Sequence, residues 1–314
     1  MKTGYGLGVT TGFLTAKFPF YGHDGLSIDF SSQYAYNRQL GVGFVVCGAD
    51  VSPFADLLIH FLTQPFNQPK SIPAVALEST LLKPYLGYYR LKTPRFQIFR
   101  YLEEVFHGYY LDIERGSLVC YGFKRPKRLL IPVTAISFRK IDENLPSIIV
   151  TKNKQGNAVL YDWGAYFEKV SFAQIIIERI LLFGSLFSAI GLFFSMIVWF
   201  CLSFYIRMTW YDSLTRSLSS IGVCCLFTAF SAFAYLGSNP ETIGSFNFLT
   251  ATYFIGTSLF AILSIIGFIV AASRFRKIKN NWARWYLLIT ATWLLYLVFF
   301  LYYYDLLGLQ MWSF

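Results

Sequence analysis

The side chains best suited to chemistry are few in this sequence and lie far apart. The cysteines are odd in number and have no C-x-x-C spacing, which predicts neither a disulfide framework nor a zinc site; they are Cys47, Cys120, Cys201, Cys224 and Cys225. The three histidines, His23, His60 and His107, are too scattered to predict a metal cluster. A Walker A loop is absent, and Gly4-x-Gly6-x-Gly8 lacks the spacing of a dinucleotide turn. We therefore expect no metal and no cofactor.

Glycine and histidine recur at suggestive positions near the N-terminus. The runs are Gly4-Tyr5-Gly6-Leu7-Gly8, Gly22-His23-Asp24-Gly25, Phe30-Ser31-Ser32 and Gly41-Val42-Gly43-Phe44-Val45-Val46. Their order resembles the last third of a serine β-lactamase-related domain, the family of class C β-lactamases, penicillin-binding-type carboxypeptidases and related esterases. The resemblance implies a third motif of the H-x-G type on the edge strand of an active site. His23 would then face a substrate carboxylate, Gly25 would keep the strand open, and the N–H of Leu26 would donate to an oxyanion. The alternative is a chance tripeptide with an ordinary strand histidine.

The motifs that complete such a site are missing. The family's S-x-x-K nucleophile and its Y-x-N should precede residue 23, and only 22 residues do. The one S-x-x-K, Ser137-Phe138-Arg139-Lys140, follows in a β-like stretch, whereas the motif must open a helix. Residues 1–20 carry no signal peptide, although an exported domain is expected. The sequence therefore predicts an inactive C-terminal portion of a hydrolase, completed by an upstream polypeptide.

The elements that would position these residues fall into two β regions. Residues 1–62 read as strands followed by a helix that begins at Ser52-Pro53. Residues 63–84 contain four prolines and predict a linker. Residues 85–178 contain eight short strand patterns at regular spacing, which predict a small antiparallel barrel or sandwich. The ends of this region resemble the lipocalin-like domain that often follows the hydrolase domain in the family.

Charge is distributed unevenly along the chain. Only 14% of the 314 residues are charged, against about 25% in an average soluble domain. Residues 179–314 hold 8 of the 27 Lys and Arg and 3 of the 17 Asp and Glu. Within this half, four uncharged stretches exceed the roughly 20 residues needed to cross a bilayer: 180–206, 217–237, 248–273 and 285–304. The sequence therefore predicts a four-helix transmembrane domain.

Basic residues predict the orientation of this domain. The loops after the first and third spans carry all the loop Lys and Arg, seven in number, and the loop after the second span and the tail carry none. By the positive-inside rule, residues 1–178 and the C-terminal tail should lie outside. The basic run Lys124 to Arg128 then predicts a solvated hairpin tip, or a contact with anionic lipid or wall polymer, and not a nucleic-acid site.

Together these patterns predict a multidomain membrane protein of the cell envelope with three parts: a partial α/β β-lactamase-like sheet plus helix, a small β barrel or sandwich, and four transmembrane helices. The resemblance implies acyl-serine hydrolysis of an amide or ester, with a peptidoglycan-like or small ester or amide ligand and candidate pocket residues His23, Asp24, Gly25 and Leu26. Membrane lipid is the other expected partner. The competing hypothesis is a non-enzymatic module, in which the β domain binds a ligand or partner and the helices anchor it.

Overall fold

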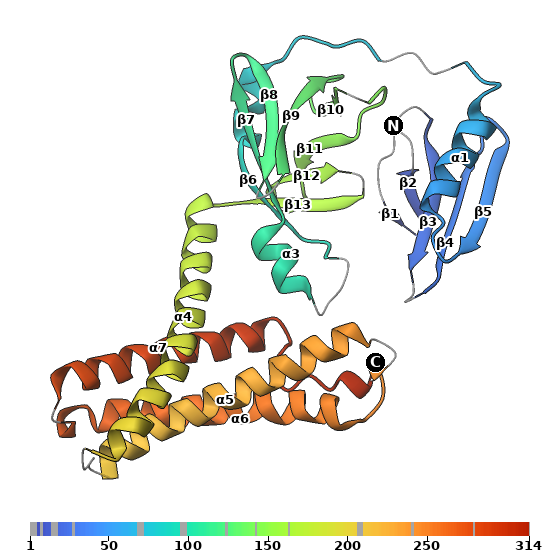
Figure 1. Ribbon diagram of the computed structural model, residues 1–314. Coiled ribbons are helices and arrows are strands. Elements are labelled where there is room, and N and C mark those ends of the chain that lie inside the picture. The colour runs from blue at the N-terminus through green and yellow to red at the C-terminus, as the bar shows by residue number, and fades with distance from the viewer. Residues whose placement is uncertain are drawn as a thin grey trace. The chain divides into compact units, whose positions relative to one another are not determined.

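The structure is a computed structural model that describes residues 5–6, 9–13, 18–26, 29–67, 72–94, 99–122, 125–141, 143–162, 164–205, 210–239, 242–278 and 280–313. The chain divides into two compact units, residues 1–175 and 176–314. The first unit contains a five-stranded sheet and a closed β barrel, and the second contains the long helices (Figure 1).

The five-stranded sheet is an antiparallel meander in which each strand pairs with the next along the chain. Its strands are β1 (Tyr5–Gly6), β2 (Val9–Phe13), β3 (Phe20–Leu26), β4 (Ser31–Asn37) and β5 (Val42–Gly48). The turn between β4 and β5 forms because the side chain of Asn37 accepts hydrogen bonds from the backbone N–H groups of Gln39 and Leu40, both at 2.9 Å. The strand that carries His23 is thus the middle strand of the sheet. This corrects the expectation of an edge strand, because β2 pairs with β3 from Phe20 to Gly22.

One helix covers one face of this sheet. Helix α1 (Ser52–Thr63) begins at the predicted Ser-Pro pair and packs Ile59 against Phe20 and Ala35 from two central strands. Side chains alternate across a strand, so the residues next to Phe20 on β3 and next to Ala35 on β4 point to the opposite face. The helix therefore gives the sheet one buried side.

The barrel closes completely within the chain. Eight strands pair antiparallel in sequence order, and the last, β13 (Ala165–Val170), returns to pair with the first, β6 (Gly87–Leu91), with Phe167 opposite Leu91. The strands between them are β7 (Gly108–Glu114), β8 (Ser117–Gly122), β9 (Arg125–Pro132), β10 (Ser137–Lys140), β11 (Ile148–Lys152) and β12 (Ala158–Asp162). Closure leaves no free strand edge. The prediction of a small antiparallel barrel is confirmed.

Positive backbone angles mark the hairpin between β7 and β8. Arg115 and Gly116 both have positive φ, 50° and 77°, which is the conformation of a two-residue turn that matches strand twist. Helix α3 (Arg100–Phe106), between β6 and β7, was not anticipated. Of the predicted basic run, Arg125 to Arg128 begin β9 directly after the turn from β8, where Gly122 pairs with Arg125, and Lys124 lies outside the described residues. Lys127 there pairs with Glu114 across the strands at 2.6 Å.

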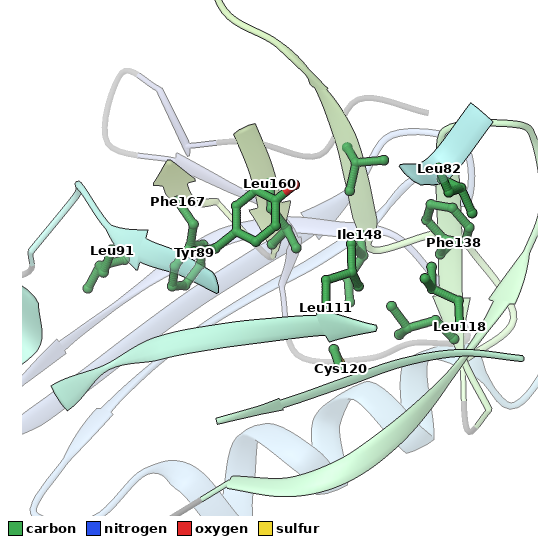
Figure 2. Close-up of a cluster of buried hydrophobic side chains, with 12 residues drawn as sticks. Leu82, Tyr89, Leu91, Leu111, Leu118, Cys120, Phe138, Ile148, Leu160 and Phe167 are labelled. Carbon is green, nitrogen blue, oxygen red and sulfur yellow. The ribbon is translucent and has the colours of Figure 1, made fainter. Parts of the chain in front are cut away.

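Apolar side chains fill the inside of the barrel. Leu111, Leu118, Phe138, Ile148 and Leu160 each come from a different strand and are almost completely buried. Figure 2 shows these side chains converging with others of the same cluster. The eight strands therefore enclose a continuous hydrophobic core.

The segment before the first barrel strand belongs to the barrel. The backbone N–H of Ile72 donates to Asn144 O at 3.2 Å, and that of Val75 donates to Pro132 O at 3.0 Å. Helix α2 (Ser79–Leu82) then inserts Leu82 into the barrel core, followed by the short helix η1 (Lys83–Tyr85). The region predicted as a linker, residues 63–84, therefore ends in a segment that packs against the barrel.

The second unit contains four helices that are long and apolar enough to cross a membrane, as predicted. They are α4 (Phe172–Ser203), α5 (Trp210–Ser238), α6 (Phe248–Ser273) and α7 (Asn281–Tyr303). Helix α4 begins two residues after the barrel ends at Val170, and its Phe172 ring contacts Tyr88 and Tyr110 of the barrel wall at centroid distances of 5.9 and 5.8 Å.

Small residues let α5 and α6 approach closely. A Cβ atom added at Gly256 would lie 2.8 Å from Cys225 O and 2.9 Å from the Cβ of Ala229. One added at Gly267 would lie 2.7 Å from the Oγ of Ser219. Helices in lipid gain most from such packing, because lipid offers no hydrophobic drive for association. Small residues therefore set the close contact between these two helices.

We predict that Gly256→Ala lowers the thermal unfolding midpoint of the detergent-solubilised chain, since overpacking a tight contact costs about 1–3 kcal/mol. Gly237→Ala in the same helix pair is the matched control, because nothing lies within 4 Å of a Cβ at that position. Equal midpoints for the two variants would contradict the close-approach interpretation.

Candidate functional site

The histidine singled out from the sequence lies on the uncovered face of the five-stranded sheet. The ring Nδ1–H of His23 donates to the backbone oxygen of Asp24 at 2.5 Å. Strand alternation puts Gly25 on the same face as His23 and puts Asp24 and Leu26 on the other. The four predicted pocket residues are thus divided between two faces, and the side chain of Leu26 is 88% exposed.

Nine residues of β3, β4 and β5 form the uncovered face, which we call the open face. The strand registers arrange them in three rows: Tyr21, Tyr36 and Gly43; then His23, Tyr34 and Val45; then Gly25, Ser32 and Cys47. In the first row the two tyrosine rings stack at a centroid distance of 5.7 Å. Val45 is 74% exposed, and the Cys47 thiol is free and exposed. The open face is therefore aromatic and apolar, with His23 as its one ionisable nitrogen base.

Two glycines of the open face make room for their neighbours. A Cβ at Gly25 would lie 2.7 Å from the Oγ of Ser32, and one at Gly43 would lie 3.0 Å from the Cβ of Tyr36. The sequence resemblance implied that Gly25 keeps the strand open to a substrate. The geometry gives it a local role instead, because the space above Gly25 is taken by Ser32.

Helix α1 carries a second uncovered surface. Phe54, Leu57 and Phe61, which we call the α1 stripe, recur at helical spacing and are 60–70% exposed. The same helix buries Ala55 and Ile59 against the sheet. Helix α1 is therefore apolar both toward the sheet and away from it, a pattern that pure core packing does not require.

A charged cluster lies inside the barrel wall. Lys140 Nζ is 2.9 Å from Asp162 Oδ1 and 3.5 Å from Glu143 Oε1, and these side chains are 6–8% exposed. The hydroxyl of Tyr109 donates to Asp162 Oδ2 at 2.7 Å, and that of Ser147 donates to Glu143 Oε2. Each carboxylate therefore has a cation and a hydroxyl beside it, as buried charges require. The cluster links β10 to β12 and β7.

The S-x-x-K run occupies β10 and does not form a nucleophile–base pair. Ser137 Oγ lies 2.7 Å from Thr134 Oγ1, and the Lys140 ammonium is committed to the buried carboxylates. Among the described residues, no group of three or more His, Cys, Asp or Glu side chains could hold a metal ion.

Comparisons with known proteins give little similarity. No family model matches the chain, and no curated protein matches it. Two solved structures resemble it weakly: a crystal structure of SurE with D-Leu, 16% identical with a TM-score of 0.31, and a crystal structure of SurE, 14% identical with a TM-score of 0.32. They cover 53% and 54% of this chain, which spans 39% of the length of each. Likeness at this level carries no argument about function.

These findings correct the resemblance drawn from the glycine and histidine runs. No family model matches the chain, β-lactamase and penicillin-binding-protein models included, and the four residues of the implied pocket divide between the two faces of the sheet. The H-x-G tripeptide is a weak signal because it fixes only two residue types, and such a short pattern occurs by chance in many strands. The signal for the open face in the sequence is alternation, since Tyr34 and Tyr36 alternate with buried positions and Val45 alternates with half-buried ones.

We predict that Lys140→Met strongly destabilises the barrel, because removing one partner of a buried ion pair leaves uncompensated charge and costs about 3–5 kcal/mol. Lys127→Met is the matched control, since the Lys127–Glu114 pair is exposed and such pairs contribute about 0–1 kcal/mol. The measurement is the urea midpoint at which the barrel of the full chain becomes protease-sensitive. Similar midpoints in both variants would refute a structural role for the buried cluster.

Proposed function

We propose that this chain is a non-enzymatic, membrane-anchored binding module whose open face is covered by a second polypeptide. The observation that carries the proposal is the asymmetry of the five-stranded sheet. One face is buried by α1, and the other carries three half-buried tyrosines and the exposed Val45. One face of the sheet is packed against α1, and the open face is aromatic and weakly charged. Such a face is suited to contact with another protein.

The composition of the open face favours a polypeptide partner. Tyrosine is enriched in protein interfaces because it buries a large apolar ring, loses little conformational entropy and keeps a hydroxyl for hydrogen bonding. No carboxylate, lysine or arginine belongs to the nine residues, so a strongly charged ligand has little to recognise there. The α1 stripe points away from the sheet on the opposite side of this layer and so does not belong to the open face. We infer that the partner presents an apolar surface.

The other elements support this role as scaffold and anchor. The barrel has a filled core and a closed ladder, which suit it to a rigid spacer. The four apolar helices suit the chain to the membrane. We further propose that the sheet, the barrel and the C-terminal tail lie outside the cell, because the basic loops should stay in the cytoplasm.

Cys47 provides a direct test of the open face. We predict that maleimide labels Cys47 about ten-fold more slowly in native membranes than in the purified chain, since a bound partner must leave before the thiol can react. Peptide mass spectrometry measures the labelling rate without altering the other cysteines.

The control for this experiment is Gln155→Cys, placed at an exposed turn of the barrel that lies outside the open face. Its rate should be the same in membranes and in the purified chain. If Cys47 also reacts equally fast in both, no partner covers the open face and the proposal fails.

The orientation has its own test. We predict that a membrane-impermeant maleimide labels Gln155→Cys in intact cells and labels Arg276→Cys only after permeabilisation. The physical reason is the retention of Lys and Arg on the cytoplasmic side during insertion. Labelling of both positions from outside, or of Arg276→Cys alone, would reverse or abolish the proposed topology.

A further inference from the structure

The five-stranded sheet ends in β5, which has one strand partner in the described chain. Strand β5 pairs with β4 along its whole length, and the order of the described strands places none on its other side (Figure 1). Backbone N–H and C=O groups alternate between the two sides of a strand, so about half of those in β5 point away from β4. This side of β5 is therefore a row of hydrogen-bonding groups that a further strand can use.

Exposure of the side chains rises toward this edge on both faces of the sheet. On the face that α1 covers, Ala35 of β4 is buried, whereas Phe44, which lies opposite it on β5, is half-buried. On the open face, Tyr34 of β4 is half-buried, and Val45, which lies opposite it on β5, is 74% exposed. The apolar layers of both faces are therefore incomplete at β5.

Strand β5 lacks the features that usually protect an edge from pairing. Its seven residues, Val-Gly-Phe-Val-Val-Cys-Gly, include no charged residue and no proline. Its register against β4 runs without a shift from Val42 to Gly48, so no bulge bends it away. The strand at the other end of the described sheet, β1, has only two residues. A long, regular and uncharged edge is the kind that pairs with another strand.

We propose that β5 pairs antiparallel with β5 of a second copy of this chain, so that two five-stranded sheets join into one. Two identical antiparallel strands are related by a two-fold axis, and an axis at Val45 lets all seven residues pair. Val45 then lies opposite Val45 of the second copy, on the open face. Phe44 lies opposite Val46 on the face that α1 covers, and Cys47 lies opposite Gly43.

The side chains of β5 suit a copy of the same strand. Each copy supplies the strand edge that the other lacks in the described chain. A two-fold axis brings equal charges together, and β5 has no charge to repel its copy. Apolar β-branched and aromatic residues that lie directly opposite each other stabilise a strand pair. The inference concerns the edge of the sheet and does not rest on a partner at the open face, because Gly43 has no side chain to cover the Cys47 thiol.

Disulfide cross-linking in native membranes tests the pair. Two versions of the full chain with different epitope tags, each carrying Val45→Cys, Cys47→Ser and Cys201→Ser, are expressed together, so that neither native exposed cysteine remains. Directly opposite residues have Cβ atoms about 4.5–5.5 Å apart, from which a small movement reaches disulfide range. Oxidation should therefore give a dimer that holds both tags. No cross-link, or a cross-link to a foreign protein alone, overturns the proposal.

The matched control for cross-linking is Asp24→Cys in the same background. Asp24 is exposed and lies on β3, two strands from the edge. Two copies joined at β5 keep these positions about 20 Å or more apart, since neighbouring strands are about 4.8 Å apart. This variant should not cross-link. Equal cross-linking at both positions would indicate random collision and refute the pair.

A charge at the two-fold axis should separate the copies. We expect Val45→Lys to weaken dimerisation of the full chain in detergent by about ten-fold or more, because it puts two ammonium groups directly opposite each other. Val45→Thr keeps a β-branched side chain without charge and should leave the dimer within about a few-fold of the parent chain. Light scattering after size-exclusion chromatography measures the mass of the protein in each sample.

The thermal midpoint separates a lost dimer from a misfolded chain. Because the Val45 side chain is 74% exposed, both variants should unfold close to the midpoint of the parent chain. A parent chain that is monomeric at every concentration overturns the proposal. A dimer that survives Val45→Lys unchanged also overturns it, because the copies then meet at another surface.

Discussion

Every apolar face that this chain makes has to be covered, and the three parts of the molecule meet that requirement differently. The barrel does so by closing on itself, since β13 pairs with β6 and the enclosed leucines and aromatic residues fill the interior. The bundle does so by close helix contact and, we infer, by lipid. The five-stranded sheet does so on one side only, where Ile59 of α1 packs on it. An aromatic face in water is energetically unfavourable, and this is why we propose that a partner covers the open face.

Charged side chains are used in two contrasting ways. In the barrel, Lys140 is surrounded by Asp162 and Glu143, so the buried charges compensate one another within the protein. At the end of the bundle, Arg216 and Arg284 lie on aromatic rings and belong to a strongly cationic segment. Opposite charges make the burial of Lys140 tolerable, whereas Arg216 and Arg284 have aromatic rings beside them.

His23 illustrates why a three-residue motif identifies a site only together with the residues around it. In the structure, His23 lies on the middle strand of the sheet, with Tyr34 beside it and Gly25 opposite Ser32. Its strand neighbours Asp24 and Leu26 point to the other face, so the four residues do not line one pocket. The row of tyrosines around His23 is better explained as contact surface than as reaction machinery. No family relationship supports a catalytic interpretation.

The sequence by itself determined the parts that depend on local periodicity. Long uncharged runs predicted the four helices that are long and apolar enough to cross a membrane, eight short strand patterns predicted the barrel strands, and the Ser52-Pro53 pair predicted the start of α1, because each pattern lies in residues close in the chain. Only the tertiary structure decided which strand lies at an edge, that the segment around Leu82 enters the barrel, and that Lys140 meets Asp162. These outcomes depend on pairing and packing between residues far apart in sequence, and a local pattern of residue types does not specify which distant strand or side chain will be the neighbour.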